Sequence, residues 1–216
     1  MLFNLISTLM ICISIYVSFL EFRRDSSILK EMYLKRKIDY LWAFLMALIG
    51  VTSIAVLSTS NLPTFLTWSW LSVFNTMDGS PQSATNMTLQ PFAWDSIIAT
   101  SLFWIILSFS LPYLAKLEEE VYRSNKLGLR ERIKSSIFFG FAHIFMGVNL
   151  VAVFVIGITG FIYSIFYKRA YLKSILKGTQ VAEEEALLAS TSIHTKYNFI
   201  LVTLVAIISI LMTIKN

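Results

Sequence analysis

Long apolar runs alternate with more polar segments along the whole chain. Five runs contain no Asp, Glu, Lys or Arg: 2–20, 40–57, 96–115, 137–167 and 197–214. A helix needs roughly 20 apolar residues to cross a hydrocarbon core of ~30 Å, and most of these runs come close to that length. The pattern predicts an all-α polytopic membrane protein, a bundle of about six transmembrane or partly membrane-embedded helices. We expect residues 1–216 to form a single transmembrane domain.

The run 137–167 allows two topologies, because its 31 residues are long for one span and short for two. If it crosses once, the segment 168–196 lies outside the cell. If it folds as a helical pair turning near 147–149, that segment is cytoplasmic. The pair needs a first arm that begins earlier, near Gly128, because a helix rises only about 1.5 Å per residue.

The basic residues favour the helical pair. Of the 18 Lys and Arg residues, six lie in 21–39, six in 116–136 and five in 168–196, and none lies in 58–95. Clustering of this kind indicates positive-inside topology and not a nucleic-acid surface, although the net charge is +5. We therefore expect a multi-pass protein of the plasma membrane, with 58–95 on the outer face and no nucleic-acid partner.

Composition agrees with this class of protein. Hydrophobic residues make up 56% of the chain, and the mean hydropathy is +0.68. The one cysteine, Cys12, excludes an internal disulfide framework and a thiolate metal cluster.

Ionisable residues beside membrane spans are costly, so three polar clusters become candidates for a functional site. The first cluster follows the span 96–115 and extends its helix. Glu119 and Arg123 share a helix face as an i,i+4 pair, while Glu118 is turned about 100° away and can accept a proton. The alternative is a solvated charge run beside the membrane.

The other two clusters use both histidines of the chain. Phe139 and His143 are spaced so that a ring packs against the imidazole, and the small Gly140 permits close helix approach. His194 and Asn198 also share a helix face, and both can donate hydrogen bonds to a negative oxygen. A structural histidine and an interhelical hydrogen-bond pair are the respective alternatives.

The ordered set Glu-Glu-x-x-x-Arg, Phe-x-x-x-His and His-x-x-x-Asn resembles the signature of the CPBP family. These are the CAAX proteases and bacteriocin-processing enzymes, also called the Abi family, which are intramembrane proteases. The resemblance covers about residues 96–214, whereas 1–95 would supply two N-terminal spans and an outer loop. One departure is Ser124, where the family often has Gly after the Arg.

The resemblance implies an intramembrane endopeptidase with its site between helices near the cytoplasmic side. Glu118 would activate water with help from His143, and His194 with Asn198 would stabilise the oxyanion. The supporting residues would be Glu119 and Arg123 as an ion pair and Phe139 behind the site. Glu183-Glu184-Glu185 lacks a following Arg and is expected to be only the acidic start of a helix.

Three questions stay open at the level of sequence. One Glu and two His could equally hold zinc, through Glu118, His143 and His194, although the chain has no His-Glu-x-x-His and the resemblance implies no metal or other cofactor. A non-catalytic scaffold or bacteriocin-immunity protein is the alternative function. The substrate could be a prenylated protein, a peptide precursor or an anchored membrane protein.

Overall fold

The computed structural model describes residues 2–59, 66, 94–146 and 148–215. The segment 58–95, which we expect on the outer face, lies almost wholly outside these residues.

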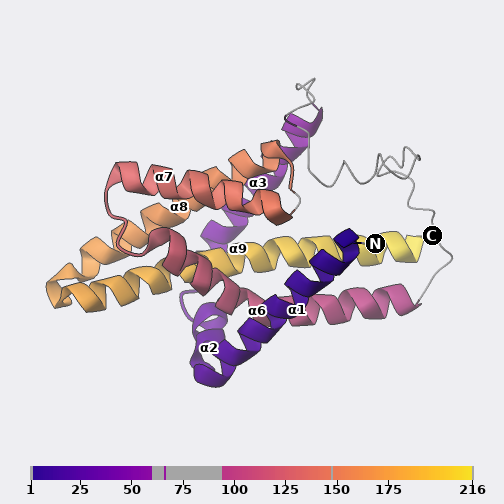
Figure 1. The fold of residues 1–216 in the computed structure, drawn as a ribbon, viewed down its shortest axis with the longest axis horizontal. Helices are drawn as coiled ribbons and strands as arrows, with labels where there is room; N and C mark the ends of the chain where they lie inside the picture. Colours follow the sequence, from indigo (N-terminus) through magenta and orange to yellow (C-terminus); the bar gives the residue numbers. More distant parts are fainter. Residues whose placement is uncertain (1, 60–65, 67–93, 147, 216) are drawn as a thin grey trace. The chain divides into compact units, whose positions relative to one another are not determined.

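Every regular element in the described part of the chain is a helix, as predicted (Figure 1). The helices are α1 (Leu2–Arg24), α2 (Ser27–Leu34), α3 (Ile38–Thr59), α6 (Trp94–Arg123), α7 (Leu129–Ala142), η1 (His143–Met146), α8 (Leu150–Ser174), η2 (Ile175–Lys177) and α9 (Thr179–Lys215).

Four of the described helices are long and apolar enough to cross a membrane, so the chain is a membrane protein. The candidate spans are Ile38–Leu57, Ile97–Arg123, Leu150–Lys177 and Thr179–Ile214. The last of these would be about 54 Å long as a straight helix, which exceeds the ~30 Å hydrocarbon core. Part of α9 must therefore lie outside the hydrocarbon.

Contacts divide the chain into two compact units, each built from separate stretches of sequence. The first unit comprises Met1–Phe44, Leu89–Val121 and Leu187–Asn216. The second unit comprises Leu45–Thr88 and Tyr122–Ala186.

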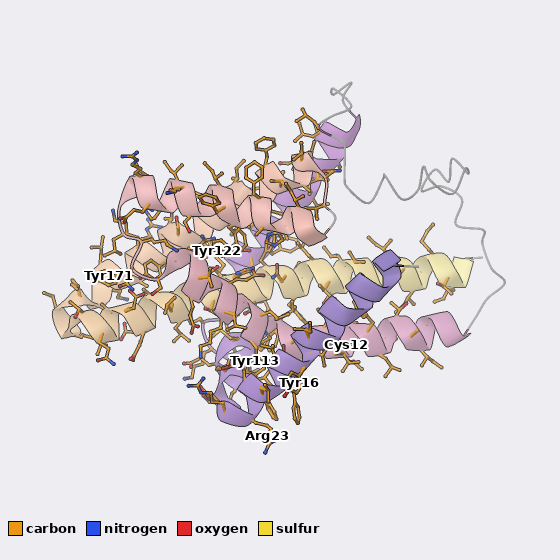
Figure 2. The ribbon with its side chains drawn as sticks, viewed as in Figure 1. Cys12, Tyr16, Arg23, Tyr113, Tyr122 and Tyr171 are labelled. Atoms are coloured by element: carbon orange, nitrogen blue, oxygen red, sulfur yellow. The ribbon has the colours of Figure 1, made fainter. Side chains whose placement is uncertain are left out.

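In the first unit, α2 packs on α6 through a small apolar core. Ile28 and Met32 of α2 are buried against Tyr113 of α6, which is labelled in Figure 2. The ring of Phe22 meets that of Phe109 edge to face at a centroid distance of 5.2 Å. Burial of these large side chains supplies most of the stabilisation of a short helix such as α2.

The C-terminal helix runs beside α6 in the same unit. The indole Nε1 of Trp104 donates a hydrogen bond to Oγ1 of Thr203 at 3.0 Å. Farther along α6, Glu119 meets His194. Because the later residue of α6 meets the earlier residue of α9, the two helices are antiparallel.

In the second unit, α7 and α8 form the predicted helical pair (Figure 1). The first arm begins at Gly128, whose backbone N–H donates to Oε2 of Glu131 at 3.1 Å. The second arm begins after Asn149, whose Oδ1 accepts a hydrogen bond from the Ala152 N–H at 2.9 Å. Both positions match the sequence prediction, and both carry the polar contacts that helix N-termini require.

A glycine sets the close approach of this pair, as its small size predicted. A Cβ atom on Gly140 would lie 2.6 Å from the carbonyl oxygen of Val153 and 3.1 Å from Cα of Gly157. Such a separation is below any real contact, so α7 can approach the backbone of α8 only without a side chain at this position.

The last helix is longer than the expected final span. We expected a span over 197–214 and the acidic start of a helix at 183–185, and α9 runs from Thr179, directly after Gly178 with its left-handed φ of 114°, to Lys215. The segment 168–196 therefore consists mostly of helix. Its last seven residues, 190–196, are buried, and the helix continues through them.

Candidate active site

Two adjacent glutamates of α6 face one histidine of α9. The Nδ1 atom of His194 lies 2.9 Å from Oε1 of Glu119, and its Nε2 atom lies 3.4 Å from Oε2 of Glu118. All three residues belong to the first unit. The imidazole thus has a carboxylate at each ring nitrogen, although these partners lie 75 and 76 positions away in the sequence.

The two carboxylates differ in their access to solvent. The side chains of Glu119 and His194 are 0% and 2% exposed, whereas that of Glu118 is 35% exposed. A carboxylate only accepts hydrogen bonds, so we assign the Nδ1 proton of His194 to the contact with Glu119. This hydrogen bond fixes the orientation of the ring and aims Nε2 at Glu118, the only one of the three groups that a substrate or water can reach readily.

Asn198 follows His194 by one turn of the same continuous helix. The two residues therefore share a face of α9, as the i,i+4 spacing predicted. Asn198 is half-buried. Its amide can donate two hydrogen bonds and accept two, which suits a group that holds a carbonyl oxygen.

The other candidate residues belong to the second unit, where they form an aromatic cluster. The ring of Phe139 packs against His143 with centroids 4.8 Å apart and planes at 68°, which confirms the predicted ring contact. The guanidinium carbon of Arg123 lies 4.9 Å from the centre of the Phe139 ring, within the range of a cation–π interaction. Phe139 is thereby fixed between a cation and an imidazole.

His143 has a defined tautomer in this cluster. Its Nδ1 atom lies 2.8 Å from the carbonyl oxygen of Phe139. A carbonyl can only accept, so Nδ1 carries the proton and Nε2 is available to accept another. The assistance of His143 to Glu118, and the ion pair between Glu119 and Arg123, stay predictions.

The acidic triplet has a structural role. Oε1 of Glu183 accepts hydrogen bonds from Oγ of Ser124 at 2.8 Å and from the Asn125 N–H at 3.2 Å, and its other oxygen accepts from the Tyr167 hydroxyl. Asn125 has a left-handed φ of 59°, which Asn tolerates better than most residues. Glu183 therefore holds the turn after α6 in place.

Sequence reasoning missed a second polar cluster in the first unit. Nζ of Lys196 donates to Oγ of Ser192 at 2.6 Å and lies 3.9 Å from Oδ2 of Asp39. Oγ of Ser192 in turn donates to the same carboxylate oxygen at 2.7 Å. The side chains of Lys196 and Asp39 are 0% and 2% exposed. The i,i+4 spacing of Ser192 and Lys196 around His194 was the available signal, but we grouped Lys196 with the solvated basic residues.

Among the residues that the structure describes, no group of three His, Cys, Asp or Glu side chains is arranged to hold a metal ion. We therefore derive no step of the chemistry through zinc.

Comparison with known proteins adds no relative: no protein-family model, no curated protein and no solved structure matches this chain. Its function therefore has to be argued from the site itself.

Proposed function

We propose that this protein is an intramembrane endopeptidase that hydrolyses a peptide bond with water activated by Glu118. The observation that carries the proposal is the contact of one buried imidazole with two carboxylates of unequal exposure. A buried acid that orients a histidine, and a reactive group beyond it, is the arrangement used in hydrolases to move protons during acyl transfer. Here Glu119 is the orienting acid and Glu118 is the base.

The chemical steps follow from these positions. Glu118 takes a proton from water as the water oxygen attacks the carbonyl carbon of the substrate, and the carbonyl becomes a tetrahedral oxyanion. The protonated Glu118 then gives its proton to the leaving nitrogen while the C–N bond breaks. The products are a carboxylate and an amine. His194, held by Glu119, stabilises the protonated form of Glu118, because Nε2 of a ring protonated at Nδ1 accepts a hydrogen bond from the carboxyl group.

Asn198 is the proposed donor to the oxyanion. It lies one helical turn from His194 on the same face of α9, and its half-buried amide does not ionise. A preorganised neutral donor of this kind typically contributes a factor of roughly 10² to 10³ to the turnover rate. We propose His143 as a further assisting group on the basis of the CPBP-like motif order.

The substrate proposed is a membrane-anchored peptide or protein cut at the cytoplasmic face of the plasma membrane. The basic segments around α6 and α7 support this orientation under the positive-inside rule. Glu118 lies close to the C-terminal end of a candidate span, Ile97–Arg123, and a substrate at that depth would be reached near the interface. Prenylated proteins and peptide precursors both fit this class.

The test compares two single-residue variants of α6 in proteoliposomes. Purified wild-type protein, Glu118→Gln and Glu120→Gln are each incubated with solubilised cell membranes, and new peptide N-termini are quantified by mass spectrometry. Glu120 is the matched control because its side chain is exposed. Its distance of 4.0 Å from its i,i+4 partner Lys116 is long for an ion pair. We expect wild type and Glu120→Gln to produce the same new termini, and Glu118→Gln to produce at least about 100-fold less.

A different result points to the alternative function. If Glu118→Gln retains the helical content of wild type and produces the same termini, the endopeptidase proposal is wrong. If none of the three samples yields new peptide N-termini but the protein binds a membrane peptide, it is a non-catalytic scaffold.

A further inference from the structure

The second unit contains an apolar groove between α7 and α8 that the proposed chemistry does not use. The groove has a volume of about 560 Å3, within the usual range for a ligand site. It is lined by Ile133, Ser136, Ile137, Phe141, Val153, Phe154, Gly157, Ile158 and Phe161. Several of these side chains are exposed, including Phe154 and Ile158. Because α8 is a candidate membrane span, the groove faces a medium that contains acyl chains.

One end of the groove is strongly basic. A second depression, lined by Leu129, Arg130, Ile133, Lys134 and Ile137, shares Ile133 and Ile137 with the groove and continues it toward the start of α7. Arg130 and Lys134 are exposed there. The single acid of this helical turn, Glu131, accepts a hydrogen bond from the Gly128 N–H at the helix N-terminus.

A third basic residue beside the groove is buried. Arg132 is 8% exposed. Its guanidinium carbon lies 5.6 Å from the ring centre of Phe161, which lines the groove. Its Nε atom is buried without a hydrogen-bond partner. Arg132 is not itself a lining residue, but its cation adds positive charge beside the groove at this end of α7.

From these observations we infer that the α7/α8 groove binds an anionic diacyl phospholipid, with the phosphate at Arg130 and Lys134 and an acyl chain along the groove. The dimensions agree. From Arg130 to Phe141 the helix rises about 16 Å, and one leaflet contributes about half of the ~30 Å hydrocarbon core. A basic pocket between membrane helices is a known means of binding anionic headgroups. A peptide or a second copy of the chain would satisfy the apolar lining but would leave the cationic end without its counter-charge.

Native mass spectrometry of the purified full-length protein tests the inference. The protein is titrated with dioleoyl-phosphatidylglycerol and, separately, with dioleoyl-phosphatidylcholine. We expect one phosphatidylglycerol molecule to be retained more tightly than phosphatidylcholine. The double variant Arg130→Gln/Lys134→Gln should lose roughly fivefold in this preference for each charge removed, which corresponds to about 1 kcal/mol per basic residue at an anionic surface.

Two further variants separate the headgroup from the acyl chain. Arg169→Gln removes an exposed charge of α8 outside the groove and should leave lipid binding unchanged. Gly157→Leu keeps every charge but adds a side chain to a lining residue whose Cβ has room, since the nearest atom is 3.4 Å away. It should reduce phosphatidylglycerol binding severalfold. Circular dichroism checks that each variant keeps its helical content.

Three results would overturn the inference. They are equal retention of the two lipids by wild type, an equal loss of preference in Arg169→Gln and in the double variant, or a dimer that Gly157→Leu dissociates. The inference does not depend on the proposed endopeptidase, because it is read from lipid binding alone.

Discussion

The Nδ1 atom of His194 lies 2.9 Å from Oε1 of Glu119, and both side chains are almost completely withdrawn from solvent. This buried pair lies directly behind Glu118, which is one-third exposed. Neighbouring glutamates of one helix therefore have different environments. The buried one is suited to hold the imidazole, and the exposed one is suited to react.

This difference predicts losses of stability of unequal size from two matched substitutions. Glu119→Gln removes the charged acceptor of a fully buried hydrogen bond and should lower the free energy of unfolding by about 1.5 to 3 kcal/mol. Glu118→Gln should lower it by less than about 1 kcal/mol, because a partly exposed ion pair contributes little. Thermal unfolding of both variants in one detergent, followed by circular dichroism, measures the difference. Equal losses of stability would contradict the assignment of roles.

The buried Lys196 cluster predicts a large loss of stability from a single substitution. Lys196→Met removes a buried ammonium that donates to Ser192 and lies 3.9 Å from Asp39, while the closer ion partner of Asp39, Arg36 at 2.7 Å, remains. Loss of this charged hydrogen bond should cost about 1.5 to 3 kcal/mol. The control is Lys173→Met, which removes an exposed lysine and should change stability by no more than about 0.5 kcal/mol. The same thermal measurement applies, with about 2–4 °C expected for each kcal/mol in a chain of this size.

A double variant tests whether Lys196 and Asp39 interact. Lys196→Met combined with Asp39→Asn removes both members of the pair, so its loss of stability should be smaller than the sum of the two single losses. If the double variant loses the full sum, the two side chains do not interact.

Close packing of α7 on α8 predicts different outcomes at two glycines. Gly140→Ala places a methyl group 2.6 Å from a backbone oxygen that cannot move aside, and should destabilise the protein by about 1 to 3 kcal/mol. Gly157→Ala places it 3.4 Å from the nearest atom and should be neutral or slightly stabilising, since alanine is the better helix former. A larger loss at Gly157 than at Gly140 would refute this description of the helix pair.

The proposed chemistry also predicts resistance to metal removal. Peptide cleavage by the wild-type protein in liposomes should be unchanged by 1,10-phenanthroline, because Glu118 and His194 supply the proton transfers. Loss of cleavage that added zinc restores would show that these side chains serve as metal ligands.

Much of the fold was predictable because apolar runs in a membrane protein translate directly into helices. The 96–115 run and its polar extension became the continuous helix α6, and Gly128 and Asn149 were recognised as the starts of the two arms. The burial of the stretch 190–196 within α9 was not predictable, because burial depends on tertiary packing.

The sequence singled out the three residues that meet in the candidate site, but it did not predict their contact. Order and spacing picked out Glu118, Glu119 and His194, and local helix geometry then suggested Arg123 as the partner of Glu119. In the structure α9 brings His194 to both carboxylates, which no i,i+4 rule can show. Lys196 was assigned to the solvent for the same reason, because sequence alone does not show which face of a long helix is covered.

The account depends most directly on the two contacts of the His194 ring, and 15N NMR of histidine-labelled protein measures them. The chain has two histidines, so a His143→Asn variant assigns the signals. We expect a protonated Nδ1 in His194 whose chemical shift changes in Glu119→Gln, while Glu118→Gln changes mainly the Nε2 shift. A His194 ring protonated only at Nε2, with an Nδ1 shift indifferent to Glu119→Gln, would contradict the account.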